Sequence, residues 1–233
     1  NYSVLRNAVE KVSHSMSKLV RASSARRANI VELAENIVRS NAGITDKDLV
    51  RSCVNAFCAK TPLPYSELRL LGDSLRYALI KQFTVYASKI IYRFHTENKA
   101  RADARQGRIS EKYVHSLSYV KTLYEFSDTK GKHRFSEYCL KRGRNVYTAA
   151  ANDARVLACY CGGIDALTDS LRADFIDAEF ISELSASGKI YERGCDSWKN
   201  ITVGTRTEYL RLTEKLSVKR KAVSYTHLTL PTN

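Results

Sequence analysis

Six carboxylates lie between residues 165 and 183, and their spacing has chemical meaning. They are Asp165, Asp169, Asp174, Asp177, Glu179 and Glu183. On a helix, the members that are four residues apart share a face. Paired carboxylates can hold a divalent cation or perform general acid–base catalysis. The interleaved apolar residues Leu167, Leu171 and Ile181 favour a plainer interpretation, in which the acids form the solvated face of amphipathic helices.

Two runs of basic residues are the second feature. They comprise Lys89, Arg93, Lys99, Arg101, Arg105 and Arg108, and then Lys130, Lys132, Arg134, Lys141, Arg142 and Arg144. The aromatic residues among them are Tyr92, Phe94, Tyr113, Phe135 and Tyr138. Basic and aromatic side chains together can bind single-stranded nucleic acid. Most of these aromatic residues occupy core-facing helical positions, so we interpret the runs as surface charge over a buried aromatic core.

The histidines, cysteines and paired glycines match no catalytic or metal-binding pattern. Four isolated histidines lack a serine, cysteine or acid at triad spacing: His14, His95, His115 and His133. The six cysteines lack the spacing of a secreted disulfide scaffold or a zinc finger: Cys53, Cys58, Cys139, Cys159, Cys161 and Cys195. We expect reduced thiols in a cytosolic compartment. Gly162-Gly163 lacks the lysine of a phosphate-binding loop, and we predict a helix break there. The sequence therefore predicts no catalytic, cofactor-binding or metal-binding residue.

Composition indicates a helical globular protein with an unusual charge. The chain has 233 residues, of which 44% are hydrophobic and 27% charged, with only 3 prolines and 10 glycines. No run approaches the ~20 apolar residues that span a bilayer. The formal net charge is +14. Such an excess is typical of proteins that bind nucleic acid, an anionic membrane surface or nucleotide phosphates, or whose acidic neighbours belong to a missing part.

Apolar periodicity predicts an all-α protein, an irregular multi-helix bundle with one long helix over about 66–96. Val4, Leu5, Ala8, Val9, Val12, Met16, Leu19 and Val20 form the first amphipathic stripe. Further helices are expected over 30–38, 49–57, 110–124, 134–160, 165–184 and from 205 onward. The two prolines at 62 and 64 mark the clearest break. No alternating strand pattern and no internal repeat is visible.

Capping signals predict several helix ends. Thr45 is expected to cap one helix and Ser66 another, and Gly188 to end a third by a Schellman motif. Thr205 and Glu208 form a capping box that should start the final helix. On that helix we expect Tyr209, Leu212 and Leu216 to face inward.

Both ends of the sequence indicate a fragment. Asn1 begins within a helical pattern, and residues 224–233 (SYTHLTLPTN) resemble the translated adapter read-through found at the ends of assembled environmental sequences. We therefore expect an N-terminal helical segment at 1–60, a helical region at 61–221 and a non-native tail at 224–233.

Two stretches of the sequence form a recognisable combination. The first is 63–71 (LPYSELRLL) followed by 75–80 (LRYALI). The second combines Phe175, Phe180 and Leu184 with 188–193 (GKIYER), Thr205-Arg206 and 209–211 (YLR). In their order and separation, the two stretches resemble the cyclic β-1,2-glucan synthases of bacteria. Ala186-Ser187 replaces the family's Asp-Pro, and extra residues fill 196–203.

The resemblance implies the N-terminal cytosolic helical region of a membrane enzyme that polymerises glucose from UDP-glucose, with its catalytic parts downstream. Such a region would lie on the cytoplasmic side of the inner membrane, and the fragment itself would be soluble. Its partners would be the rest of the polypeptide and an anionic membrane surface.

Two other functions stay open. A basic helical module that binds nucleic acid is the first, although no helix-turn-helix with a basic second helix is visible and we do not expect nucleic acid as the partner. A protein-interaction domain that uses the helix over 68–94 as its contact surface is the second.

Overall fold

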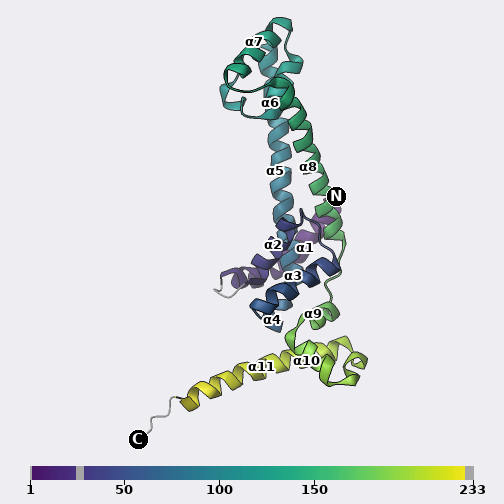
Figure 1. Cartoon of the computed structure of the whole chain (residues 1–233). Coiled ribbons are helices and arrows are strands. Elements are labelled where there is room, and N and C mark those ends of the chain that lie inside the picture. Colours follow the sequence, from purple (N-terminus) through teal and green to yellow (C-terminus); the bar gives the residue numbers. More distant parts are fainter. Residues whose placement is uncertain (1, 25–28, 229–233) are drawn as a thin grey trace. The chain divides into compact units, whose positions relative to one another are not determined.

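The computed structural model describes the backbone of residues 2–24 and 29–228 and the side chains of 2–15, 17–19 and 30–217. All regular structure in these residues is helical, which confirms the all-α prediction. The helices shown in Figure 1 are α1 (Tyr2–Ser24), α2 (Asn29–Ser40), α3 (Lys47–Lys60), α4 (Tyr65–Leu68), α5 (Leu71–Arg105), α6 (Leu117–Phe126), α7 (Thr129–Lys141), α8 (Val146–Arg172), α9 (Ala178–Leu184), α10 (Ala186–Gly194) and α11 (Val203–Leu228). Two 3₁₀ helices are η1 (Glu111–Tyr113) and η2 (Asp196–Asn200).

These helices form two compact units. Unit 1 contains residues 1–81 and 167–233, and unit 2 contains residues 82–166. Helices α5 and α8 contribute residues to both. From the sequence we expect a boundary at residue 60, between an N-terminal segment and the following helical region. The two compact units do not test that boundary, which stays a prediction. The predicted tail at 224–233 lies largely outside the described part of the chain. The backbone of residues 224–228 belongs to α11, and no side chain of the tail is described.

In unit 1, the amphipathic N-terminal helix buries part of its predicted apolar stripe. Helix α1 packs on α2, and α2 packs on α3. Ala8, Val12 and Leu19 of the stripe are buried, whereas Val9 is 46% exposed. The side chains of Met16 and Val20 lie outside the described residues. Helix α9 joins α3, so that the Arg51 guanidinium lies 5.4 Å from the centre of the Phe180 ring. The apolar faces of short helices thus form the core of this unit.

In unit 2, the second half of α5 and the first part of α8 run side by side, with α6 and α7 at one end (Figure 1). The pairing is antiparallel, because Tyr86 contacts Tyr160 at 5.9 Å while Arg93 binds Asp153 at 2.8 Å. The core at the α6–α7 end is largely apolar and contains Ala100, Val114, Tyr119, Val120, Leu123, Phe135, Cys139, Val146 and Ala149.

The long helix exists, but the predicted bounds of 66–96 are wrong. The chain first makes the single turn of α4, and α5 then runs from Leu71 to Arg105. The stretch after residue 96 is polar yet helical, because its residues are good helix formers and are joined by ion pairs four residues apart. Lys99 binds Asp103 at 2.8 Å in this way, and Arg93 binds Glu97 at 2.7 Å.

Two predicted caps are displaced, and a third is absent. Asp46, rather than Thr45, caps α3 by accepting from the backbone N–H of Leu49 at 2.8 Å. The final helix begins at Val203, and the Thr202 hydroxyl accepts from the backbone N–H of Thr205 at 3.3 Å. Ser66 forms no cap, because α4 already begins at Tyr65 and Ser66 lies within it.

The helices predicted over 110–124, 134–160 and 165–184 have different ends. The first is divided into η1 and α6, and the second into α7 and α8, with Gly143 at φ +69° in the turn between α7 and α8. Helix α8 then continues through Gly162 and Gly163 as far as Arg172, so the predicted break there is wrong. A Cβ on Gly163 would lie 2.7 Å from the Tyr86 ring, which explains one of the two glycines by close helix packing.

Gly188 lies inside α10 rather than at the end of a helix, which contradicts the predicted Schellman stop. Its backbone N–H donates to the Oγ of Ser185, which caps α10, at 2.8 Å. A Cβ at Gly188 would overlap the carbonyl oxygen of Ser182 on α9. The glycine therefore permits the sharp turn between two consecutive helices.

Gly188→Ala should lower the free energy of unfolding by about 2 kcal/mol, because the added methyl group meets backbone rather than a movable side chain. Gly194→Ala, at the end of the same helix, places its Cβ with no described atom within 4 Å. That control should be neutral or stabilising by up to about 1 kcal/mol. Urea unfolding followed by circular dichroism measures both, and equal midpoints would contradict the close approach.

Candidate functional site

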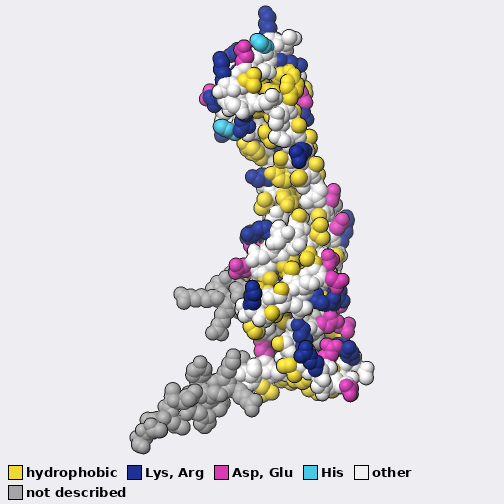
Figure 2. Space-filling model, viewed as in Figure 1, with side chains coloured by type: hydrophobic (Ala, Val, Ile, Leu, Met, Phe, Trp, Pro, Cys, Tyr) yellow, Lys and Arg dark blue, Asp and Glu magenta, His cyan; other side chains and the backbone are white. Residues whose placement is uncertain are grey.

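The two basic runs of the sequence meet at one cavity in unit 2. The end of α5 and the loop after it supply Arg105 and Arg108, and the start of α7 supplies Lys130 and Arg134. Together with the end of α6, these segments enclose about 540 Å³. Figure 2 shows lysine and arginine side chains around the α6–α7 end of this unit on the face in view.

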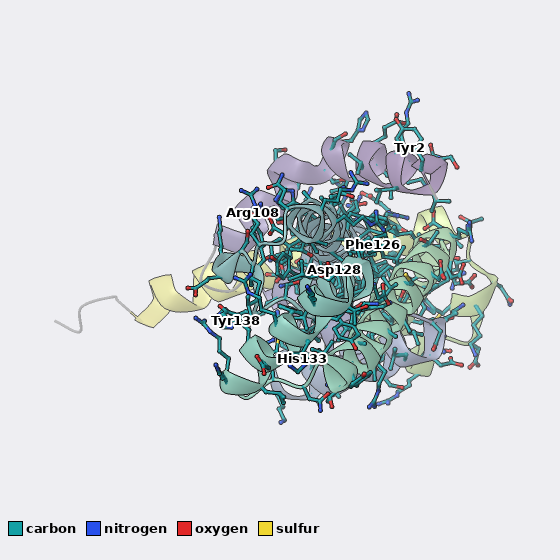
Figure 3. All side chains as sticks on the ribbon, turned by 90° about the horizontal axis from the view of Figure 1, so that it is seen from above. Tyr2, Arg108, Phe126, Asp128, His133 and Tyr138 are labelled. Atoms are coloured by element: carbon teal, nitrogen blue, oxygen red, sulfur yellow. The ribbon has the colours of Figure 1, made fainter. Side chains whose placement is uncertain are left out.

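Local backbone geometry positions these cations. Gly107 takes φ +60° after the end of α5, and the backbone N–H of Arg108 donates back to the carbonyl of Asp103 at 3.1 Å. At the other wall, Asp128 caps α7 by accepting from the backbone N–H of Gly131 at 2.6 Å. Figure 3 looks down on this end of the unit and labels Arg108 and Asp128. A helix end and a helix start therefore border the same cavity.

A buried carboxylate supports the α5 side of the cavity. The side chain of Asp103 is fully buried and accepts from the Tyr119 hydroxyl at 2.7 Å and from Lys99 Nζ at 2.8 Å. The Tyr119 hydroxyl in turn accepts from the backbone N–H of Ser110 at 2.8 Å. The Nε of Arg108 lies 3.3 Å from the same carboxylate.

This network sets the ionisation of both acidic groups. Burial alone raises the pKa of Asp103, but the hydrogen bonds with Lys99, Ser110 and Tyr119 outweigh it, so the pKa lies below its ordinary value of 3.8. Burial, followed by the contact with the Asp103 carboxylate, raises the pKa of Tyr119, although the hydrogen bond from Ser110 opposes the rise. Asp103 therefore remains charged and Tyr119 remains neutral near neutral pH.

Most cations around the cavity lack a counter-charge. Among the described residues, no carboxylate forms an ion pair with Arg105, Lys130 or Arg134. The one carboxylate that lines the cavity, Asp128, is engaged by the start of α7. Arg108 shares Asp103 with Lys99. The cavity consequently carries a net positive charge.

Several other basic residues of the runs have structural partners. Arg93 is largely buried and binds Glu97 and Asp153. Burial raises the pKa of Asp153, and the neighbouring Arg93 opposes that rise. Arg142 binds Glu111 at 3.0 Å. The structure thus separates cations that pair within the unit from the cations that line the cavity, which spacing in the sequence does not distinguish.

The aromatic residues only partly follow the core-facing interpretation. Phe135 is buried, whereas Tyr92 and Phe94 are 52% and 60% exposed. The reason is local to unit 2, because Arg93 turns toward α8 and its two neighbours must turn away. Phe126 was not singled out in the sequence, yet it lines the cavity, is 57% exposed and lies 5.2 Å from the Arg101 guanidinium.

The six acids serve separate structural roles rather than forming one site. Asp169 binds Arg172, Asp174 binds Lys11 and Arg76, Asp177 caps α9, Glu179 binds Arg206 and Glu183 binds Arg51. Asp165 lies on the part of α8 that belongs to unit 2. The hydrogen bond from Lys11 is the main cause that lowers the pKa of Asp174. Within the described ranges, no group of three or more potential ligands gathers closely enough to hold a metal ion.

Histidines and cysteines likewise remain dispersed. The histidine contacts join His14 with the Glu10 carbonyl, His95 with Tyr113, His115 with Arg144 and His133 with Glu137. All six cysteines are free thiols. Cys139 is buried, and desolvation raises the pKa of its thiol. The Ser13 hydroxyl lies 3.5 Å from His14 Nδ1, but that nitrogen makes its short contact, at 2.7 Å, with the Glu10 carbonyl.

Two stretches of the sequence, 63–80 and 175–211, come together in unit 1. Helix α4 from the first stretch packs on both α9 and α11 from the second. Leu68, Phe180 and Leu210 from these helices are each fully buried. The backbone N–H and the hydroxyl of Ser66 both donate to the Glu214 carboxylate, at 3.1 and 2.6 Å. We call these contacts between α4, α9 and α11 the motif core.

The last helix packs on the motif core through a different face from the one that the sequence predicts. Tyr209, Leu212 and Leu216 are 48%, 44% and 66% exposed, and the buried residues are Arg206 and Leu210. Apolar residues occur on several faces of this helix, so periodicity alone does not select one. Polar contacts of residues on α11 select the face that packs inward.

An aromatic stack beside the motif core was also missed. Trp198 lies in η2, within the extra residues that interrupt the resemblance, and its ring stacks on Tyr191 at 4.7 Å. Tyr209 packs against both rings at 6.5 Å. A lone tryptophan in a polar segment is a weak signal, although its size favours burial.

In comparisons with known proteins, no family profile, curated protein or solved structure matches the chain. In the described residues, every helix is too short or too polar to cross a membrane.

Asp103→Asn should lower the free energy of unfolding by about 3 kcal/mol at neutral pH, because it removes the charge that Lys99 and Tyr119 bind. The folded pKa is depressed, so the wild-type contribution is present above the ordinary value of 3.8 and is lost as pH falls through the lower folded pKa. Urea unfolding should therefore show the difference shrinking as the pH falls below 3.8. Asp165→Asn, at an exposed site in the same unit, serves as the control and should change little at either pH. A pH-independent loss for Asp103→Asn would contradict the ionised network.

Proposed function

We propose that this chain is the non-catalytic N-terminal helical region of a membrane-bound cyclic β-1,2-glucan synthase, a glucosyltransferase that uses UDP-glucose. The motif core carries this proposal. Two stretches that resemble that family are about 110 residues apart in the sequence. They pack on each other in unit 1, as segments of one structural element would.

The contacts of the motif core involve residues that belong to the resemblance itself. Leu68 and Leu210 are buried members of the two stretches, and Ser66 bonds across to α11. Arg206 of the Thr-Arg pair is largely buried and lies 3.3 Å from Glu179. Burial, followed by the nearby Glu214 carboxylate, raises the pKa of Glu67. The resemblance therefore rests on side chains that pack and pair, and its residues have a structural reason to occur together.

In this proposal the region is a scaffold on the cytoplasmic side of the inner membrane. Unit 2 suits such a position, because it contains 15 lysines and arginines against 8 aspartates and glutamates. Basic segments near a bilayer are attracted by anionic lipid headgroups. The remaining partner in the proposal is the downstream part of the same polypeptide, which would contain the membrane-spanning and glycosyltransferase regions.

Leu210→Ala should lower the free energy of unfolding by about 3 kcal/mol, because a fully buried leucine of the motif core is removed. Leu216→Ala is the matched control on the same helix, where the side chain is 66% exposed. It should cost less than about 0.5 kcal/mol. Urea unfolding of both variants checks the predicted difference, and similar losses would mean that α11 does not pack as described.

The proposed activity is tested on the complete reading frame from which the chain derives. Membranes of a host that expresses it should incorporate labelled glucose from UDP-glucose into β-1,2-linked glucan. Leu210→Ala in the same full-length protein should reduce product, and Leu216→Ala should not. A complete reading frame without a glycosyltransferase region, or membranes that make no β-1,2-glucan, would refute the proposal.

A further inference from the structure

We propose that the cavity between α5, α6 and α7 in unit 2 binds a ligand through its phosphate group. The site lies outside the motif core, and the inference does not depend on the activity proposed above. The ligand class is a phosphomonoester or a diphosphate, supplied either as a small molecule or as a lipid headgroup.

Charge is the first argument. Four cationic side chains line the cavity, namely Arg105, Arg108, Lys130 and Arg134, against the single carboxylate of Asp128. Three of them have no ion-pair partner among the described residues. Cations that share a concave surface repel one another, and the repulsion grows as water is excluded. An anion that carries two or three charges would neutralise this excess.

The arrangement of donors is the second argument. Arginine presents a planar fork that binds phosphate oxygens in pairs, and the cavity places such forks on two separate segments. The first turn of α7, a helix of 13 residues, also borders the cavity through Lys130 and Gly131. Asp128 accepts from the Gly131 N–H, while the earlier N–H groups of a helix have no intrahelical partner. Cationic side chains from two segments and the first turn of α7 therefore border one space.

Size and lining are the third argument. A volume of about 540 Å³ lies within the range of small-ligand pockets. Ile109, Leu123 and Phe135 add an apolar floor to the polar rim, and Phe126 adds an exposed ring. The Arg101 guanidinium already lies over that ring. This lining fits a compact phosphate ester with an apolar part better than a nucleic-acid strand, which needs repeated stacking and phosphate contacts along its path.

Convergence on one cavity is what distinguishes these cations. Arg93, Lys99 and Arg142 each bind a carboxylate of unit 2. Exposed cations such as Arg155 form no ion pair among the described residues, but they do not line the cavity. The cavity therefore differs from the rest of the unit because several cations from separate segments face one space.

The test is thermal unfolding of the full chain with inorganic phosphate or pyrophosphate, at constant ionic strength maintained with chloride. Either anion should raise the midpoint in a saturable way, because a ligand that binds only the folded state stabilises it. Arg105→Gln with Arg134→Gln should weaken the apparent affinity by roughly a hundredfold, about tenfold for each charge-assisted contact. Without ligand, the double variant should unfold no earlier than wild type, because repulsion is relieved.

Arg155→Gln is the matched control, because Arg155 is an exposed arginine of unit 2 outside the cavity. It should leave the phosphate response unchanged. Vesicles of phosphatidylcholine with or without phosphatidic acid distinguish the two sources: binding that requires phosphatidic acid and is lost in the double variant identifies a lipid headgroup, and a response to pyrophosphate alone identifies a soluble ester. Equal phosphate responses in the wild type and the double variant would overturn the proposal, as would no saturable response to any of these probes. Binding of a single-stranded oligonucleotide with no response to phosphate would do the same and would favour nucleic acid.

Discussion

A carboxylate that is removed from water must be bound by donors or lose its charge, and Asp103 shows how much of unit 2 follows from this constraint. The last turns of α5 place it in the interior, where Lys99 from its own helix and Tyr119 from α6 bind it. The Tyr119 hydroxyl then holds the backbone of Ser110, and Arg108 approaches the same carboxylate from the loop. One buried charge thus ties the end of α5, the following loop and α6 together.

The same constraint distinguishes charged side chains that are neutralised within the fold from charged side chains that have no ion-pair partner. The acids that are close in sequence between residues 169 and 183 are distributed among caps and ion pairs, so they serve the folding of unit 1. Among the described residues, Arg105, Lys130 and Arg134 at the cavity form no ion pair. A cluster of like charges in the sequence can therefore be paired within the fold or left unpaired at a cavity. The sequence does not distinguish these outcomes, because they depend on where the opposite charges lie in three dimensions.

The sequence predicted the helical class, the stripe of α1 and the break at the two prolines, because these depend on local periodicity and on the missing proline donor. It failed where a distant residue decides the result. Gly163 continues a helix because Tyr86 needs the space, and α11 packs through Leu210 because partners on other helices select that face. The basic runs were visible, but their convergence on a cavity requires the turn at Gly107 and the cap at Asp128. Phe126 follows Tyr119 and Leu123 at helical spacing, so periodicity predicts a core position, whereas its ring is 57% exposed and lines the cavity.

The stack of Trp198 on Tyr191 has a practical consequence. Trp198 is the single tryptophan of the chain, and it is buried in unit 1. Its emission reports the indole environment of that unit alone, whereas helical ellipticity sums over both units. Comparing the two optical signals in one titration would reveal whether the halves of the chain melt as a single cooperative body or in succession.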